Sequence, residues 1–186
     1  MICYGSCTDS TVLYFPMHEI HPFPDFVPPG IKHLLLGSFI ARDGLSNPNY
    51  DWYYSNGRNQ FWKIIEQVYD VVLLDKATKQ ELFASLKIGI ADLIRECDRV
   101  ANNSMDTSLQ NKIYNQGIME IFSSHKLQTV YFTSQFVEKE FRMAFPELVA
   151  GYPEVKLVRL PSPSPRYATI SLVQKAGLYI KSLPAF

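Results

Sequence analysis

Two short segments of this sequence carry residue types that can bind a flat polar ligand and act on it. The first segment groups two tyrosines, two asparagines and an arginine, at Tyr53, Tyr54, Asn56, Arg58 and Asn59. Aromatic rings can stack on a planar ligand. A side-chain amide can orient a water molecule or hydrogen-bond a ligand, although it cannot act as a strong base. The segment therefore indicates a candidate binding site.

The second segment is the run 160–166, in which serines alternate with prolines. Prolines stiffen the chain because they fix φ. The hydroxyls of Ser162 and Ser164, on either side of Pro163, and the guanidinium of Arg166 can all reach phosphate groups. An ordinary proline-rich turn with a solvated arginine explains the same residues, so both interpretations remain open.

Cysteines and histidines add no metal site to these segments. Cys3, Cys7 and Cys97 lack a second ligand pair at zinc-like spacing and are too few for an iron–sulfur cluster. The four histidines show no metal-ligand spacing either. We therefore expect no metal and no cofactor, and reduced thiols in a cytoplasmic protein.

Length and composition favour one globular domain over residues 1–186, with residues 1–20 as a loose N-terminal extension. Of the 186 residues 47% are apolar, but no apolar run is long enough for a membrane span, and the N-terminus lacks the features of a signal peptide. The net charge is zero, which argues against a protein that coats DNA nonspecifically. Such a balance still allows contacts to a few phosphates. We expect a monomer.

Strand and helix patterns alternate along the chain. Short β-rich or apolar runs predict strands at 32–37, 127–133 and 155–160. Helical spacing predicts helices at 61–69 and 169–182, and Ser134 is placed to cap another helix. Thr78 and Glu81 suggest a capping box for a helix that stops at Gly89, whereas 92–100 fits helix or strand equally. The pattern predicts a three-layer α/β/α fold with a mainly parallel sheet.

The two unusual loops, 38–59 and 161–167, each follow a predicted strand. Because the carboxyl ends of parallel strands meet at one edge of the sheet, both loops are expected at that edge. Ligands of open α/β sheets bind there. The sequence thus predicts one site where the loops converge.

Several motifs together resemble the uracil-DNA glycosylase superfamily, over roughly positions 21 to 180. Leu36-Gly37-Ser38-Phe39 resembles its first motif, and the run 160–165 resembles its second, minor-groove motif. The segment 53–62, with its Phe-Trp pair, resembles a third. His21-Pro22-Phe23, Gly89-Ile90-Ala91 and Ser104-Met105-Asp106 resemble the hypoxanthine-DNA glycosylase branch.

The resemblance implies a role for each matched residue. Asn59, with Asn56 in reserve, would handle the attacking water, and Tyr54, backed by Tyr53, would stack an everted base. The remaining base-pocket residues would be Gly37, Ser38, Phe39 and Ser134. The DNA contacts would come from Ser162, Pro163, Ser164, Arg166 and Arg58. Structural roles compete with these assignments: Asn59 and Ser134 as helix caps, Asn56 as a turn residue, and Tyr54 as loop packing.

Two positions depart from the superfamily pattern. Phe39 stands where most members carry the water-handling Asp or Asn, which leaves only its backbone N–H as a donor. Leu160 stands where uracil-specific members carry a histidine. The hypoxanthine-type branch resembles this chain in lacking the first side chain, and there the asparagine before the Phe-Trp pair takes over.

The resemblance therefore implies a monofunctional DNA glycosylase for a deaminated base, hypoxanthine first and uracil second. No lysine in the matched motifs could form a Schiff base. Two alternatives remain: an inactive module of the same fold that binds nucleic acid or a damaged base, and a hydrolase of nucleosides or small metabolites.

Overall fold

A four-stranded parallel sheet forms the centre of the molecule, in the order β3-β2-β6-β7. The computed structural model describes residues 16–41, 50–99 and 105–186. The strands are β2 (His33–Gly37), β3 (Ile88–Asp92), β6 (Thr129–Phe132) and β7 (Lys156–Arg159). Leu35 of β2 pairs with Ile90 on one side and Tyr131 on the other, both in parallel register. The predicted strands at 32–37, 127–133 and 155–160 are confirmed.

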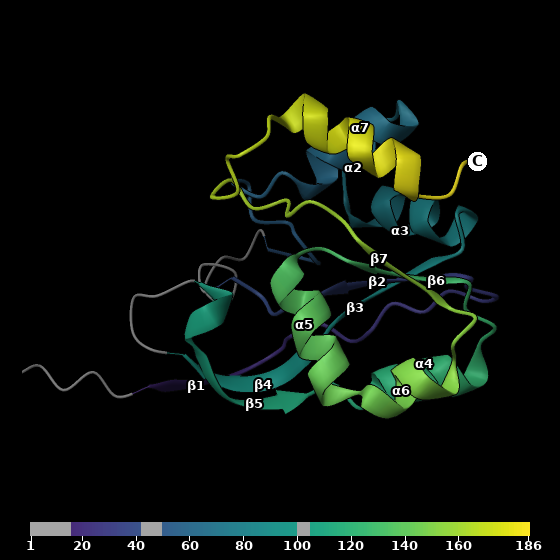
Figure 1. Cartoon of the computed structure of the whole chain (residues 1–186). Coiled ribbons are helices and arrows are strands. Elements are labelled where there is room, and N and C mark those ends of the chain that lie inside the picture. The colour runs from purple at the N-terminus through teal and green to yellow at the C-terminus, as the bar shows by residue number, and fades with distance from the viewer. Residues whose placement is uncertain (1–15, 42–49, 100–104) are drawn as a thin grey trace, which may run out of the picture.

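Helices cover both faces of this sheet (Figure 1). The upper layer of the view holds α2 (Phe61–Tyr69), α3 (Lys76–Ser85) and α7 (Leu172–Ser182). The lower layer holds α4 (Gly117–Ser124), α5 (Gln135–Ala144) and α6 (Pro146–Gly151). Leu35 belongs to the core under the upper helices, and its neighbours Leu34 and Leu36 belong to the core over the lower ones. This strand alternation produces the predicted three-layer α/β/α fold.

A smaller antiparallel sheet, ordered β1-β4-β5, lies beside the lower layer (Figure 1). It contains β1 (Met17–Ile20), β4 (Ile94–Arg99) and β5 (Leu109–Tyr114), and the 3-10 helix η1 (Asp106–Ser108) leads into β5. The chain passes from β3 into β4 through Leu93, whose N–H donates to the Gly37 carbonyl. The undecided stretch 92–100 is therefore strand over its described part.

The predicted capping box was misplaced by one turn. Asp75, not Thr78, caps α3: its carboxylate accepts from the Thr78 N–H at 2.9 Å, and the Thr78 hydroxyl accepts from the Asp75 N–H. An extended backbone at Asp75 lets its short side chain reach the third helical N–H. Gly89 is not the helix stop, because α3 ends at Ser85 and Gly89 lies inside β3.

The last helix begins later than predicted. Ser171 caps α7 in a capping box with Gln174, so the helix starts at Leu172 and not at Thr169. The predicted helix 61–69 and the Ser134 cap of α5 are both confirmed, since the Ser134 hydroxyl accepts from the Val137 N–H.

The strand order defines where a ligand can enter. β3 and β6 flank β2 on opposite sides, so the connections leaving β2 and entering β6 run over opposite faces of the sheet. The carboxyl ends of β2 and β6 therefore form a topological switch point, where open α/β sheets bind ligands. Over the described ranges, no helix has the length and apolar character needed to cross a membrane.

Candidate active site

A cavity of about 700 Å³ opens at the carboxyl edge of the parallel sheet. The 161–167 loop and the described part of the 38–59 loop, of which residues 42–49 lie outside the described ranges, both line it, as the predicted convergence requires. The predicted site residues in its lining are Ser38, Phe39, Tyr53, Tyr54, Asn56, Arg58, Asn59, Ser134, Ser162, Pro163, Ser164 and Arg166. Gly37 lies just outside the lining. We call the strand-end lining (residues 38–40, Asp92, Thr133 and Ser134) the cavity floor, and the loop lining (residues 56–59 and 162–167) the cavity rim.

Asn59 sits where the two rim segments touch. The neighbouring Gln60 N–H donates to the Pro163 carbonyl at 3.0 Å, which joins the segments directly. The Asn59 Oδ1 accepts from the Phe61 N–H at 2.8 Å, so this side chain bonds the first residue of α2, although the N-cap position itself is Gln60, which makes no side-chain cap bond. Its Nδ2 has no partner among the described residues, which leaves an amide N–H₂ at the cavity. Asn59 is therefore not the N-cap that the sequence suggested, but its side chain supports the start of α2 and presents an amide to the cavity in one conformation.

Turn geometry explains much of the rest of the rim. The Asn56 Oδ1 accepts from the Arg58 N–H, and the Ser162 hydroxyl accepts from the Ser164 N–H. The Ser164 hydroxyl likewise accepts from the Arg166 N–H. These bonds stiffen the rim, and the two arginines that line it, Arg58 and Arg166, are exposed to solvent.

Tyr54 has a strained backbone, and its side chain is held by a ring contact and a hydrogen bond. Its φ is +57°, a left-handed conformation that is costly for a non-glycine residue and that concentrates at functional sites. The ring stacks on Phe61 at 4.4 Å between centroids, and the phenol bonds the Thr133 hydroxyl at 3.0 Å. Thr133 donates its own proton to the Leu36 carbonyl, so the phenol must be the donor to Thr133. Burial raises the pKa of Tyr54 well above its usual range, which keeps the ring neutral.

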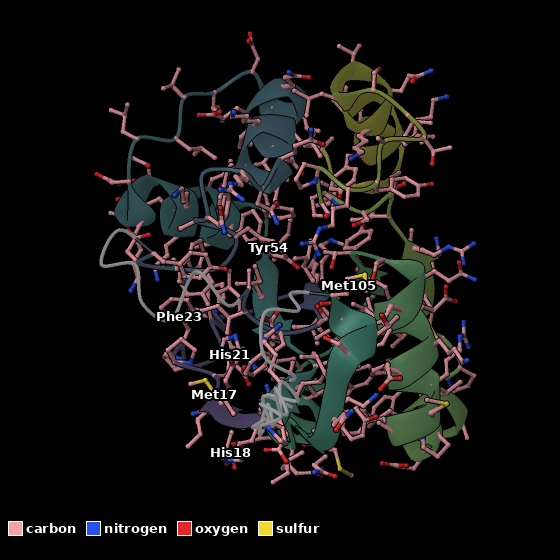
Figure 2. All side chains as sticks on the ribbon, turned by 90° about the vertical axis from the view of Figure 1, so that its left-hand side faces the viewer. Met17, His18, His21, Phe23, Tyr54 and Met105 are labelled. Atoms are coloured by element: carbon pink, nitrogen blue, oxygen red, sulfur yellow. The ribbon has the colours of Figure 1, made fainter. Side chains whose placement is uncertain are left out.

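Tyr53 lies behind Tyr54 and packs on a buried ion pair. Its ring stacks on His21 at 5.4 Å, and the His21 Nε2 donates to the Asp92 Oδ2 at 2.9 Å. Figure 2 shows His21 beside Phe23, below Tyr54. Burial alone would lower the pKa of His21, but the hydrogen bond and negative charge of Asp92 outweigh it and raise the pKa. The pair fixes one carboxylate oxygen of Asp92 and leaves the other on the floor side.

Asp106, in η1, brings a second carboxylate to the cavity. Burial raises the pKa of Asp106; a hydrogen bond from Ser38 opposes this shift, and the charge of Asp92 adds to it. Two carboxylates at one cavity can stabilise a positive charge that develops between them. Neither at this cavity nor elsewhere in the described ranges do three or more His, Cys, Asp or Glu side chains form a group that could hold a metal ion.

Phe39 and Ser134 form the remaining floor. The Arg99 guanidinium lies 5.6 Å from the centre of the Phe39 ring and donates to the Ile40 carbonyl at 2.8 Å. Glu19 pairs with Arg99 at 2.8 Å, and both are buried. Phe39 therefore forms an apolar wall in place of a polar side chain. Leu160 is buried in the core under the upper helices and offers no polar group either.

Sequence reasoning assigned no role to Asp92, Asp106 or Thr133. Asp92 and Thr133 stand at the carboxyl ends of β3 and β6, so the edge rule that predicted a site at the two loops would have pointed to them as well had the end of β3 been recognised. Asp106 lay in a family-like motif without an assigned role. Its cavity position depends on the antiparallel sheet, which no sequence pattern indicated.

Comparisons with known proteins define the class of fold. No protein-family model matches the chain, and no curated protein is significantly similar to it in sequence. The chain shares its fold with a candidate uracil DNA glycosylase from Methanosarcina acetivorans, known from a solution NMR structure, with a TM-score of 0.68. The two sequences are 19% identical, and the match covers 89% of this chain and 98% of the other. The fold is therefore the uracil-DNA glycosylase-like α/β fold.

Proposed function

We propose that this protein is a monofunctional DNA glycosylase that hydrolyses the N-glycosidic bond of a deaminated base, hypoxanthine first and uracil second. The observation that carries the proposal is the single cavity in which an aromatic ring, an amide and two carboxylates converge under a proline-stiffened rim. Its volume of about 700 Å³ suits a small-molecule group such as an everted nucleotide.

The residues can divide the chemistry between them. As the bond to the base breaks, positive charge develops on the sugar, and the carboxylates of Asp92 and Asp106 would stabilise it. The Asn59 amide would hold the water that adds to the sugar carbon. The departing base would take the electron pair of the broken bond, accept a hydrogen bond from a donor such as the Phe39 backbone N–H, and finally take up the proton that the water loses. Tyr54 and Phe39 would enclose the base between apolar surfaces.

One observation supports hydrolysis without a Schiff base, and a second supports a substrate preference other than uracil. No lysine is part of the cavity lining in the described residues, so no amine stands ready to attack the sugar. Leu160 is buried and apolar, so the position that carries a histidine in uracil-specific proteins cannot stabilise a uracil anion. We therefore rank hypoxanthine before uracil.

The test separates three functions with one set of substrates. Labelled duplexes with one hypoxanthine or one uracil would be incubated with the protein in chelator and then treated with alkali. Scission at the altered base supports the glycosylase. Binding without scission would instead identify an inactive module of the same fold, and hydrolysis of free nucleosides but not DNA would identify a metabolite hydrolase.

A further inference from the structure

Lys175, on α7, is a buried cation whose partners are all neutral. The residue is 1% exposed. Its Nζ donates to the Gln60 Oε1 at 2.8 Å and to the Ser164 carbonyl at 3.1 Å, and it lies 5.4 Å from the centre of the Tyr167 ring. Among the described residues no carboxylate pairs with it. Burial accordingly lowers the pKa of Lys175.

Such a position is unfavourable for stability alone. An ammonium loses its hydration on burial, and neutral acceptors compensate for this only in part. An apolar side chain of similar length would fill the same space without that cost. The position of Lys175 is therefore better explained by the two groups that its ammonium holds together than by a contribution to stability.

Of the groups that Lys175 holds, Ser164 belongs to one half of the cavity rim and Gln60 adjoins the other half. Gln60 directly follows Asn59, and Ser164 is the middle of the stiffened loop. The rest of that loop is fixed by the Tyr179 hydroxyl, which donates to the Pro161 carbonyl at 2.9 Å, and by the bond from the Gln60 N–H to the Pro163 carbonyl. Lys175 adds the bond that reaches both halves from one atom.

We propose that Lys175 is a positioning residue that locks the 162–167 loop to the Asn59 turn, and that this lock serves base eversion from duplex DNA. The inference rests on the proposed glycosylase function. In a duplex the loop must press on the helix while the target base leaves the stack, so its position relative to Asn59 matters. A single strand presents no stack to open and places little demand on the lock.

The test compares duplex and single-stranded oligonucleotides, each with one hypoxanthine, in single-turnover reactions. For Lys175→Met we expect the duplex rate to fall by about a hundredfold. The single-stranded rate should change little, and KM should move less than kcat. The melting temperature should stay the same or rise, a result that a purely structural lysine would not give. Lys181→Met, an exposed lysine on the same helix, is the matched control and should behave as wild type.

A second variant keeps the inference testable if Lys175→Met does not fold. Gln60→Met removes the same hydrogen bond from the other side and should show the same selective duplex loss, and the double variant should lose no more than either single one. Full duplex activity in either folded variant, or equal losses on both substrates, would overturn this inference alone. An inactive wild type would overturn the proposed function together with it.

Discussion

The floor and the rim of the cavity are held in different ways. The buried charges that support the floor are paired: Arg99, which bonds the Ile40 carbonyl, with Glu19, and His21 with Asp92. The rim depends on turn hydrogen bonds and on Lys175, whose partners are neutral. A paired buried charge becomes a serious defect when one partner is removed, whereas a cation with neutral partners leaves no opposite charge behind. Substitutions at the floor should therefore reduce stability, and substitutions at the rim should reduce activity.

The largest effect on stability is expected at the floor from Arg99→Met. This change leaves the buried Glu19 carboxylate without its partner, and it also removes the donor to the Ile40 carbonyl. We expect a loss of about 3–5 kcal/mol in the free energy of unfolding. Denaturant titration measures it, with Arg142→Met, an exposed arginine on α5, as the control. A loss no greater than that of the control would remove the distinction between floor and rim.

The largest effect on activity is expected at the rim from Asn59→Ala. Removing the amide that holds the attacking water should slow base excision by about 10²–10³-fold. Stability should fall by only about 1 kcal/mol, because one helix-start hydrogen bond is lost. Single-turnover rates and denaturant titration give the two numbers. Asp75→Ala, which removes the cap of α3 without touching the cavity, controls for capping; an equal loss of activity there would contradict the assignment.

Gly37→Ala tests how closely the floor is packed. A Cβ at this position would overlap both the Asp92 carboxylate and the Tyr54 phenol, so both side chains or the strand itself must move. We expect a loss of about 1–3 kcal/mol in stability, with reduced excision because the floor is displaced. Gly151→Ala is the matched control, since nothing lies near its added Cβ. A stable and fully active Gly37→Ala protein would show that the floor tolerates rearrangement.

The smallest expected effect is a pH dependence of the free energy of unfolding, caused by the titration of His21. Its folded-state pKa lies above the ordinary 6.5. The stabilisation from the His21–Asp92 pair is therefore complete below about pH 6.5 and is lost as the pH rises through the raised pKa. Unfolding measured from pH 5 to 9 should show this decline in wild type and a reduced one in His21→Gln.

His18 provides the comparison for this titration. Its pKa is also raised, mainly by the hydrogen bond that its ring N–H donates to Asp98, but it is exposed. His18→Gln should therefore leave the part of the pH dependence that comes from the buried pair. If His18→Gln removes the whole pH dependence, the buried pair does not titrate as described.

The floor was partly predictable from sequence because it follows from the strands. The apolar run before Gly37 and the β-rich run before Thr133 predicted β2 and β6, and parallel strand ends share an edge. Asp92 was missed because residues 92–100 fit either secondary structure. β1 and β5 were missed because burial in them does not follow side-chain polarity: Glu19 is buried in β1, whereas Met17 and Ile20 of β1 and Ile113 of β5 are exposed.

The rim residues were predictable by type, but the bonds that hold them were not. The prolines and serines of 162–165 predict a stiff loop, and the position of Asn59 indicates either a helix cap or a functional amide. Nothing in the sequence around Lys175 distinguishes it from a solvated helix lysine. Its burial depends on α7 packing against both the 162–167 loop just before it and Gln60, which is distant in sequence, and only the tertiary structure reveals this.

One measurement tests the central claim most directly. A duplex with a single hypoxanthine would be treated with the protein in heavy-oxygen water, and both the released base and the DNA would be weighed by mass spectrometry. We predict free hypoxanthine, an intact strand with an abasic sugar that carries heavy oxygen, and little release by Asn59→Ala. No released base, or release that Asn59→Ala leaves unchanged, would contradict the account.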